Sequence, residues 1–143
     1  MTEAQAIEII AAQFLAQWPT LTAAIAGAPV GGYPFAIDNE AFKAQDTFAF
    51  LTWQPTTSQQ MTMGSPNRKR HYLVIMVKLW SPVNQGAAAL AGLADICRRI
   101  FQSQTLGTGD GVTVQAGTTS RKTTDGSWTM CMVTFPAFYD EVS

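Results

Sequence analysis

The residues that could do chemistry are few, and the first of them is the single histidine, His71. It follows three consecutive cations, Arg68 to Arg70, at the start of an apolar stretch. Neighbouring positive charge lowers the pKa of an imidazole and makes it a poor metal ligand. A triad of serine, histidine and acid could use only His71, and no G-x-S-x-G motif occurs in the chain. We therefore expect a surface histidine beside a loop.

Metal and cofactor sites also lack the residues that they need. Cys97 and Cys131 are far apart without C-x-x-C spacing, and each occupies an apolar position, so we expect two reduced core cysteines. No Walker or Rossmann glycine pattern is present. Asp38-Asn39-Glu40 could hold a hard cation, but side chains of this kind more often cap a local turn. We expect no catalytic residue, no metal and no cofactor, hence no enzyme.

Residues suited to contact are more prominent than residues suited to catalysis. A polar run from Gln54 to Asn67 has no apolar period and ends in the basic triplet, so it is predicted to be a long loop carried by two strands. The acidic pair near the end of the chain, Asp140 and Glu141, is predicted to be a solvated tail. Set apart from these acids, the cations could steer subunits together or meet DNA phosphates. The candidate interaction residues are Gln60, Met61, Met63, Arg68, Lys69 and Arg70, with Asp38 and Glu40 as possible acidic partners.

The composition points to a protein with little surface charge. Of 143 residues, 47% are apolar and 13% are charged, whereas soluble domains average about 25% charged residues. A surface buried against other subunits and a merely neutral surface both fit this composition. The net charge of −1 argues against a general nucleic-acid-binding protein. The first residues resemble no signal peptide and no apolar run is long enough for a membrane helix, so a soluble cytoplasmic protein is expected.

The apolar pattern predicts the elements that would position these residues. Thr2 and Gln5 have the spacing of a capping box, and the helix that follows is expected to end near Gln17 because of Pro19. A second amphipathic helix is predicted from Gly86 to Gln102. Asp125-Gly126 predicts a hairpin. The expected strands are Tyr33 to Ile37 at an edge, Phe48 to Gln54, His71 to Trp80, Val112 to Ala116 and Trp128 to Phe135.

This order of elements predicts one domain over residues 1–143. Its expected class is α+β, with one mainly antiparallel or mixed sheet of four to five strands and two helices packed on one face.

A series of short segments also resembles a known family in order and spacing. The series resembles the tail-terminator-like proteins of tailed bacteriophages and prophages, which include minor tail and tail-completion proteins. The resemblance spans nearly the whole chain, although the chain has a longer segment before Tyr33 than is usual there. The segments are Gln17-Trp18-Pro19, Ile37-Asp38-Asn39-Glu40, Gln60-Met61-Thr62-Met63-Gly64, Arg70, Trp80-Ser81-Pro82, Asp125-Gly126-Ser127-Trp128 and Phe135-Pro136-Ala137-Phe138-Tyr139-Asp140-Glu141.

The resemblance implies a structural virion protein with no catalytic residues. It implies a ring, expected to be a hexamer, at the head-proximal end of a long non-contractile tail. The ring would stop polymerisation of the tail tube, present the surface for a head-completion or connector protein, and let DNA pass through its lumen. Such a protein is assembled in the bacterial cytoplasm and has no membrane partner. The alternatives are a head–tail adaptor or neck protein and, less favoured, a small enzyme or ligand-binding module with a pocket between the helix Gly86 to Gln102 and the sheet. A deep polar pocket around His71 with Asp38 or Glu40 within reach would favour that module.

Overall fold

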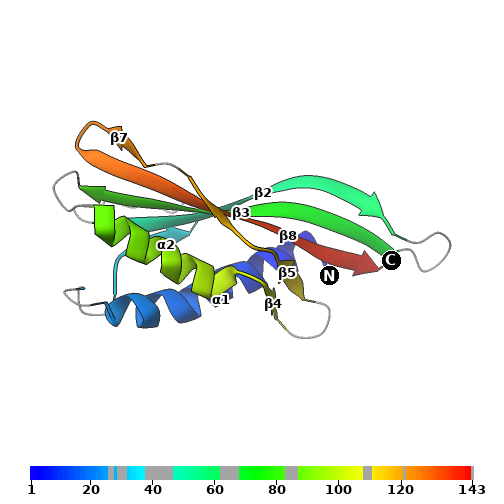
Figure 1. The fold of residues 1–143 in the computed structure, drawn as a ribbon. Coiled ribbons are helices and arrows are strands. Elements are labelled where there is room, and N and C mark those ends of the chain that lie inside the picture. The colour runs from blue at the N-terminus through cyan, green and yellow to red at the C-terminus, as the bar shows by residue number, and fades with distance from the viewer. Residues whose placement is uncertain are drawn as a thin grey trace.

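A computed structural model describes residues 1–25, 28, 32–37, 47–61, 68–82, 87–107, 111–120 and 122–142. Two helices lie on one side of a curled sheet (Figure 1). The helices are α1 (Glu3–Ala23) and α2 (Ala87–Phe101). The strands are β1 (Phe35–Ile37), β2 (Phe48–Gln60), β3 (Arg68–Pro82), β4 (Gln104–Leu106), β5 (Val112–Val114), β6 (Thr118–Thr119), β7 (Thr123–Asp125) and β8 (Trp128–Val142).

The sheet is mixed and larger than predicted. Its order is β1-β2-β3-β8-β5-β4, and β6 and β7 also pair with β8, which makes eight strands among the described residues where four to five were expected. Only the β1–β2 pair is parallel among the described pairs. The edge of β8 that faces away from β3 pairs with three short strands, β5, β6 and β7, which follow one another along the chain with short breaks between them. At Gly117, for example, a Cβ atom would lie 2.5 Å from the Phe135 ring, so this segment crosses close over the core. The α+β class was correct.

The core is one layer of side chains between the sheet and the helices. Alternate residues of the central strands are buried and form a single cluster with the inner faces of both helices. At the centre of this layer, Phe14 stacks between Trp18 and Phe101, with ring centroids 5.0 and 6.1 Å away. The predicted helix from Gly86 to Gln102 and the hairpin at Asp125-Gly126 are both present. The buried strand residues are Ala49, Leu51, Leu73, Ile75, Val77, Leu79, Cys131, Val133, Phe135, Ala137 and Tyr139.

Helix α1 begins as predicted but does not end at Pro19. The capping box at Thr2 and Gln5 is formed. The helix then continues through Pro19 to Ala23, so the predicted end near Gln17 was wrong. Trp18 and Thr22, one turn apart, are both fully buried, and the Thr22 hydroxyl donates to the Trp18 carbonyl oxygen at 2.6 Å. Packing of this last turn against the core outweighs the loss of one backbone hydrogen bond at the proline.

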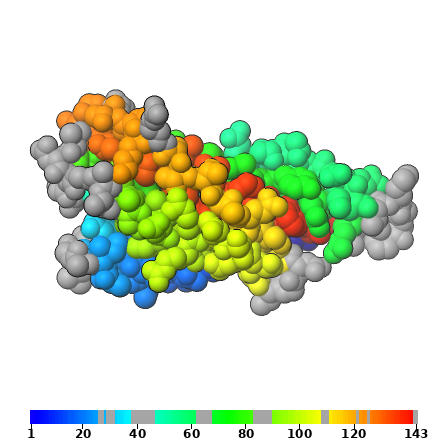
Figure 2. All heavy atoms as spheres, viewed as in Figure 1, coloured from blue at the N-terminus to red at the C-terminus, as the bar shows by residue number. Residues whose placement is uncertain are grey.

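The predicted loop from Gln54 is largely strand. Strand β2 runs to Gln60 and β3 starts at Arg68, with Gln60 opposite Lys69 and a register shift between Pro55 and Ser58. Strand β8 accompanies them to Val142. The prediction failed because the β2 residues from Gln54 to Gln60 are exposed and so carry no apolar alternation. We call the three-stranded end formed by residues 54–61, 68–73 and 137–142 the tongue; it continues past the helices as the narrower end of the molecule (Figures 1 and 2).

Candidate functional site

The tongue carries five of the eight predicted interaction residues. Gln60 and Met61 lie at the end of β2, and both are exposed. Arg68, Lys69 and Arg70 open β3 beside them. Their register brings the two groups together, because Gln60 faces Lys69 and the Met61 N–H donates to the Arg68 carbonyl oxygen at 2.7 Å. The other three predicted residues, Met63, Asp38 and Glu40, lie outside the described residues.

Two of the three cations already have an acidic partner within the chain. Asp140 accepts from Arg70 Nε at 2.9 Å and from a terminal guanidinium nitrogen at 3.2 Å, and Arg68 Nε lies 3.5 Å from the same carboxylate. The hydrogen bonds from Arg70 hold the pKa of Asp140 below its usual value, and the bond to Asp140 raises the pKa of Arg70. The Arg70 guanidinium also lies over the Phe138 ring, 4.2 Å from its centroid.

The prediction of a solvated tail at Asp140 and Glu141 was therefore wrong. Asp140 and Glu141 belong to β8, where they lie opposite Arg70 and Lys69 of β3. Sequence separation hid this pairing, since Arg70 and Asp140 are 70 positions apart. Lys69 projects to the opposite face of the sheet from its two neighbours and is exposed, so it is the cation of the triplet best placed to meet another molecule.

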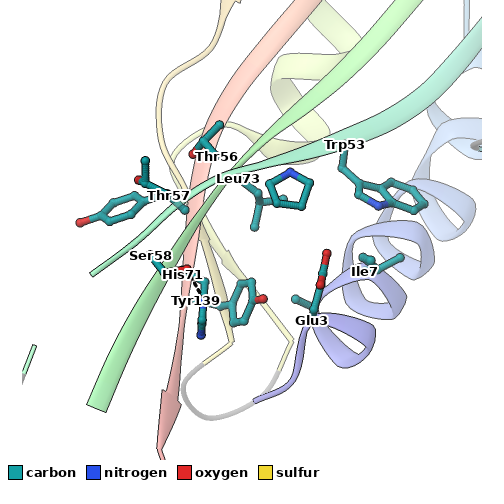
Figure 3. A pocket seen from close by; sticks show the side chains of 12 residues that line it. Glu3, Ile7, Trp53, Thr56, Thr57, Ser58, His71, Leu73 and Tyr139 are labelled. Atoms are coloured by element: carbon teal, nitrogen blue, oxygen red, sulfur yellow. Dashed lines mark hydrogen bonds between the residues drawn. The ribbon is translucent and has the colours of Figure 1, made fainter. Parts of the chain in front are cut away.

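A pocket lies on the helix side of the tongue, where the first turns of α1 approach β2, β3 and β8. Its volume is about 180 Å³. Figure 3 shows side chains from all four elements around it, with the Glu3 carboxylate and the Tyr139 hydroxyl directed toward the same space. The residues that line it are Glu3, Ala6, Ile7, Trp53, Pro55, Thr56, Thr57, Ser58, His71, Tyr72, Leu73 and Tyr139.

His71 is part of this pocket and is held in a polar row. Its Nδ1 atom lies 2.7 Å from the Ser58 hydroxyl oxygen, and its ring stacks on Tyr139 with centroids 5.1 Å apart. Its Nε2 atom is buried without a hydrogen-bond partner, and the nearest described carboxylate oxygen, of Glu141, lies 3.9 Å away. The expected surface histidine beside a loop is thus a half-buried strand residue.

Serine, histidine and acid are therefore close together, but their geometry is not that of a general base. A contact of 3.9 Å between His71 Nε2 and Glu141 is too long for the hydrogen bond that would orient the imidazole. Among the described residues, no group of three or more His, Cys, Asp or Glu side chains could hold a metal ion. Neither described helix has the length and apolar character needed to cross a membrane.

The ligand pocket that the sequence suggested, between the helix Gly86 to Gln102 and the sheet, is not where this pocket lies. The pocket includes His71, but α1 covers it and not α2, and the residues that build it were not predicted. Tyr139 is 6% exposed, and burial is the main reason why its pKa is raised, with Glu3 and Glu141 adding to the shift. The tyrosine lies opposite His71 across the β3–β8 pair, while Trp53 comes from the other neighbouring strand. The pairing register of β2, β3 and β8 would have shown that these residues are neighbours, but a single sequence does not give that register.

Comparison with known proteins supports the fold and leaves the function open. No protein-family profile and no curated protein sequence matches this chain. A solved structure, of a protein whose name states no function, aligns with a TM-score of 0.66 at 15% identity, covering 92% of this chain and 94% of that one. A chain from the virion of a native gene transfer agent particle aligns with a TM-score of 0.49 at 16% identity, covering 92% and 98%. The first likeness establishes a shared fold, and the second is too weak to carry an argument.

Proposed function

We propose that this chain is a non-enzymatic structural protein of a phage-like virion, and within that class a tail terminator. Copies of the chain would form a ring, expected to be a hexamer, at the head-proximal end of the tail. The ring would stop the growth of the tail tube and present a surface to a head-completion or connector protein. The ordered series of segments that resemble the tail-terminator-like family supports this role. The main structural observation in its favour is a surface suited to contact between copies of the chain.

That surface is the outer face of the central sheet, on the side away from the helices. Phe48, Trp80 and Met130 lie side by side across β2, β3 and β8, and Trp128 contacts Phe48 edge-on with ring centroids 5.6 Å apart. All four side chains are only partly buried. Aromatic and methionine side chains with almost no charge among them are typical of the core of a protein interface.

The outer face of α1 offers a second surface of complementary character. Exposed small side chains recur every fourth residue at Ala4, Ala12 and Ala16, beside the exposed Leu15. Glu8 is the charged residue of this row. Because the helices and the outer sheet face lie on opposite sides of the molecule, contact between these two surfaces is head-to-tail, as a ring requires.

The tongue would then reach the tail tube or a neighbouring copy. It projects past the helices (Figure 2), and Gln60, Met61 and Lys69 near its end are exposed. Arg68 and Arg70 pair with Asp140 and so join β3 to β8 within the tongue.

The proposal is tested by light scattering of the purified protein, alone and mixed with the tail-tube protein of the same phage or prophage. A ring-sized mass together with tubes of limited length is expected. Lys69→Ala should reduce the binding of tube ends, whereas Arg99→Ala, at an exposed position on α2, should not. A protein that stays monomeric with tubes present and does not limit their length would overturn the proposal.

A head-side adaptor is the second candidate, since it would use the same ring-forming surfaces. Co-purification with the connector protein in preference to the tube protein would favour it. A small-ligand-binding module is favoured by a different observation, the pocket around His71.

A further inference from the structure

We propose that the pocket beneath the tongue is a binding site for a cation on a short apolar stem, meaning a primary amine or guanidinium such as the end of a Lys or Arg side chain. The inference concerns Tyr139, Glu3 and the apolar walls between them. It goes beyond the terminator role and does not depend on it, because the binding can be measured on the monomer.

The pocket has the size and walls for a single side chain. Its volume of about 180 Å³ is below the usual 300 Å³ or more of sites for drug-sized ligands. Trp53, Pro55, Leu73 and Ile7 form its apolar sides. A short hydrocarbon stem would lose its contact with water against these walls, which is favourable.

Tyr139 provides a polar group that the chain itself leaves unused. The residue is 6% exposed, and no hydrogen bond among the described residues involves its hydroxyl. Figure 3 shows that hydroxyl directed into the pocket. The hydroxyl oxygen is not among the buried atoms that lack a partner, so it is accessible from the pocket and can accept a hydrogen bond from a ligand that donates one.

The charges at this hydroxyl favour a cationic ligand. Glu3 lines the pocket and directs its carboxylate toward it (Figure 3), and Glu141 lies across the sheet from Lys69 on the same face. Burial raises the pKa of Tyr139 most, and both carboxylates add to this rise because they disfavour a further negative charge beside them. An anion would be repelled here, whereas an ammonium or guanidinium would be attracted and would also lie near the aromatic rings of Trp53 and Tyr139.

The test is a titration of the isotope-labelled protein with n-butylguanidinium, observed by NMR at the indole N–H of Trp53. The neutral control is n-butylurea, which has nearly the same shape. A saturable shift with a Kd of a few mM is expected for the guanidinium, and binding at least about tenfold weaker for the urea. Equal binding of both compounds, or no saturable shift up to about 50 mM of the cation, would overturn the proposal.

Three variants locate the site while the spectrum reports whether the fold is kept. Glu3→Gln and Tyr139→Phe should each weaken binding of n-butylguanidinium at least about threefold, which is the loss expected for one hydrogen bond or one nearby charge. Glu8→Gln is the matched control, since Glu8 is on the outward face of the same helix, and it should bind as the wild type does. Equal losses in Glu3→Gln and Glu8→Gln would refute the site.

The source of the cation is decided by competition. If the ligand is a side chain of a neighbouring copy or of the tube protein, n-butylguanidinium at saturating concentration should lower the assembled mass seen by light scattering, and n-butylurea should not. If the ligand is a free amine, the assembled mass should not change. Both results support the cationic chemistry of the pocket. A failed titration would leave ring formation untouched, so the two proposals fail separately.

Discussion

Asp140 links β8 to β3 within the tongue through its carboxylate. Its carboxylate is 12% exposed and accepts two hydrogen bonds from Arg70, with Arg68 as a second cationic neighbour. A carboxyl group whose pKa is lowered in the folded protein contributes stability above its unfolded pKa, and this contribution is lost as the pH falls through the folded pKa.

Asp140→Asn should therefore lower the free energy of unfolding at pH 7, by about 1 kcal/mol. The difference in the free energy of unfolding between wild type and variant should narrow as the pH falls below the ordinary pKa of an aspartate. Urea denaturation at pH 7 and at about pH 3 measures both values. Asp95→Asn is the control, because Asp95 pairs with Arg98 at 2.7 Å but is 72% exposed, and its effect should be smaller. An unchanged difference at low pH would contradict this account of Asp140.

At the scale of elements, the chain was predictable where burial repeats regularly along it. Helix α2 occupies Ala87–Phe101 where Gly86 to Gln102 was predicted, because its apolar stripe is complete. The tongue was not predictable, since an exposed strand held by backbone pairing needs no apolar alternation. The Arg70–Asp140 pair and the pocket at Tyr139 depend on strand register, which brings together residues that are distant in sequence.

The course of α1 through Pro19 gives a prediction at this scale. Pro19→Ala should fold normally and raise the free energy of unfolding by about 1 kcal/mol, because alanine restores a backbone donor and suits a helix interior far better than proline. Chemical denaturation of the two proteins measures the difference. A clear loss of stability would mean that the bend imposed by the proline ring is needed for the packing of Trp18 and Thr22.

At the scale of the molecule, the two proposals use different surfaces. Ring contacts would involve the outer sheet face and the outer side of α1, whereas the proposed cation pocket lies between the first turns of α1 and the inner sheet face of the tongue (Figure 3). A low content of charged residues, 13%, makes each charge on the ring surfaces informative. Lys78 lies between Phe50 and Met132 on the outer sheet face, and Glu8 lies within the alanine row of α1.

If the outer side of α1 in one copy meets the outer sheet face of the next, these opposite charges favour that docking. Lys78→Glu and Glu8→Lys should each shift the protein toward monomer, since each would bring like charges into a charge-poor interface. The double variant should recover much of the assembled mass, because the opposite charges are restored with their places exchanged. Light scattering measures all four proteins. Exchanging the pair Asp95 and Arg98 on α2 is the control and should leave the mass unchanged. If neither single variant lowers the assembled mass, the contact between copies lies elsewhere. If the double variant does not recover the mass that the single variants lose, Lys78 and Glu8 do not face each other across the contact.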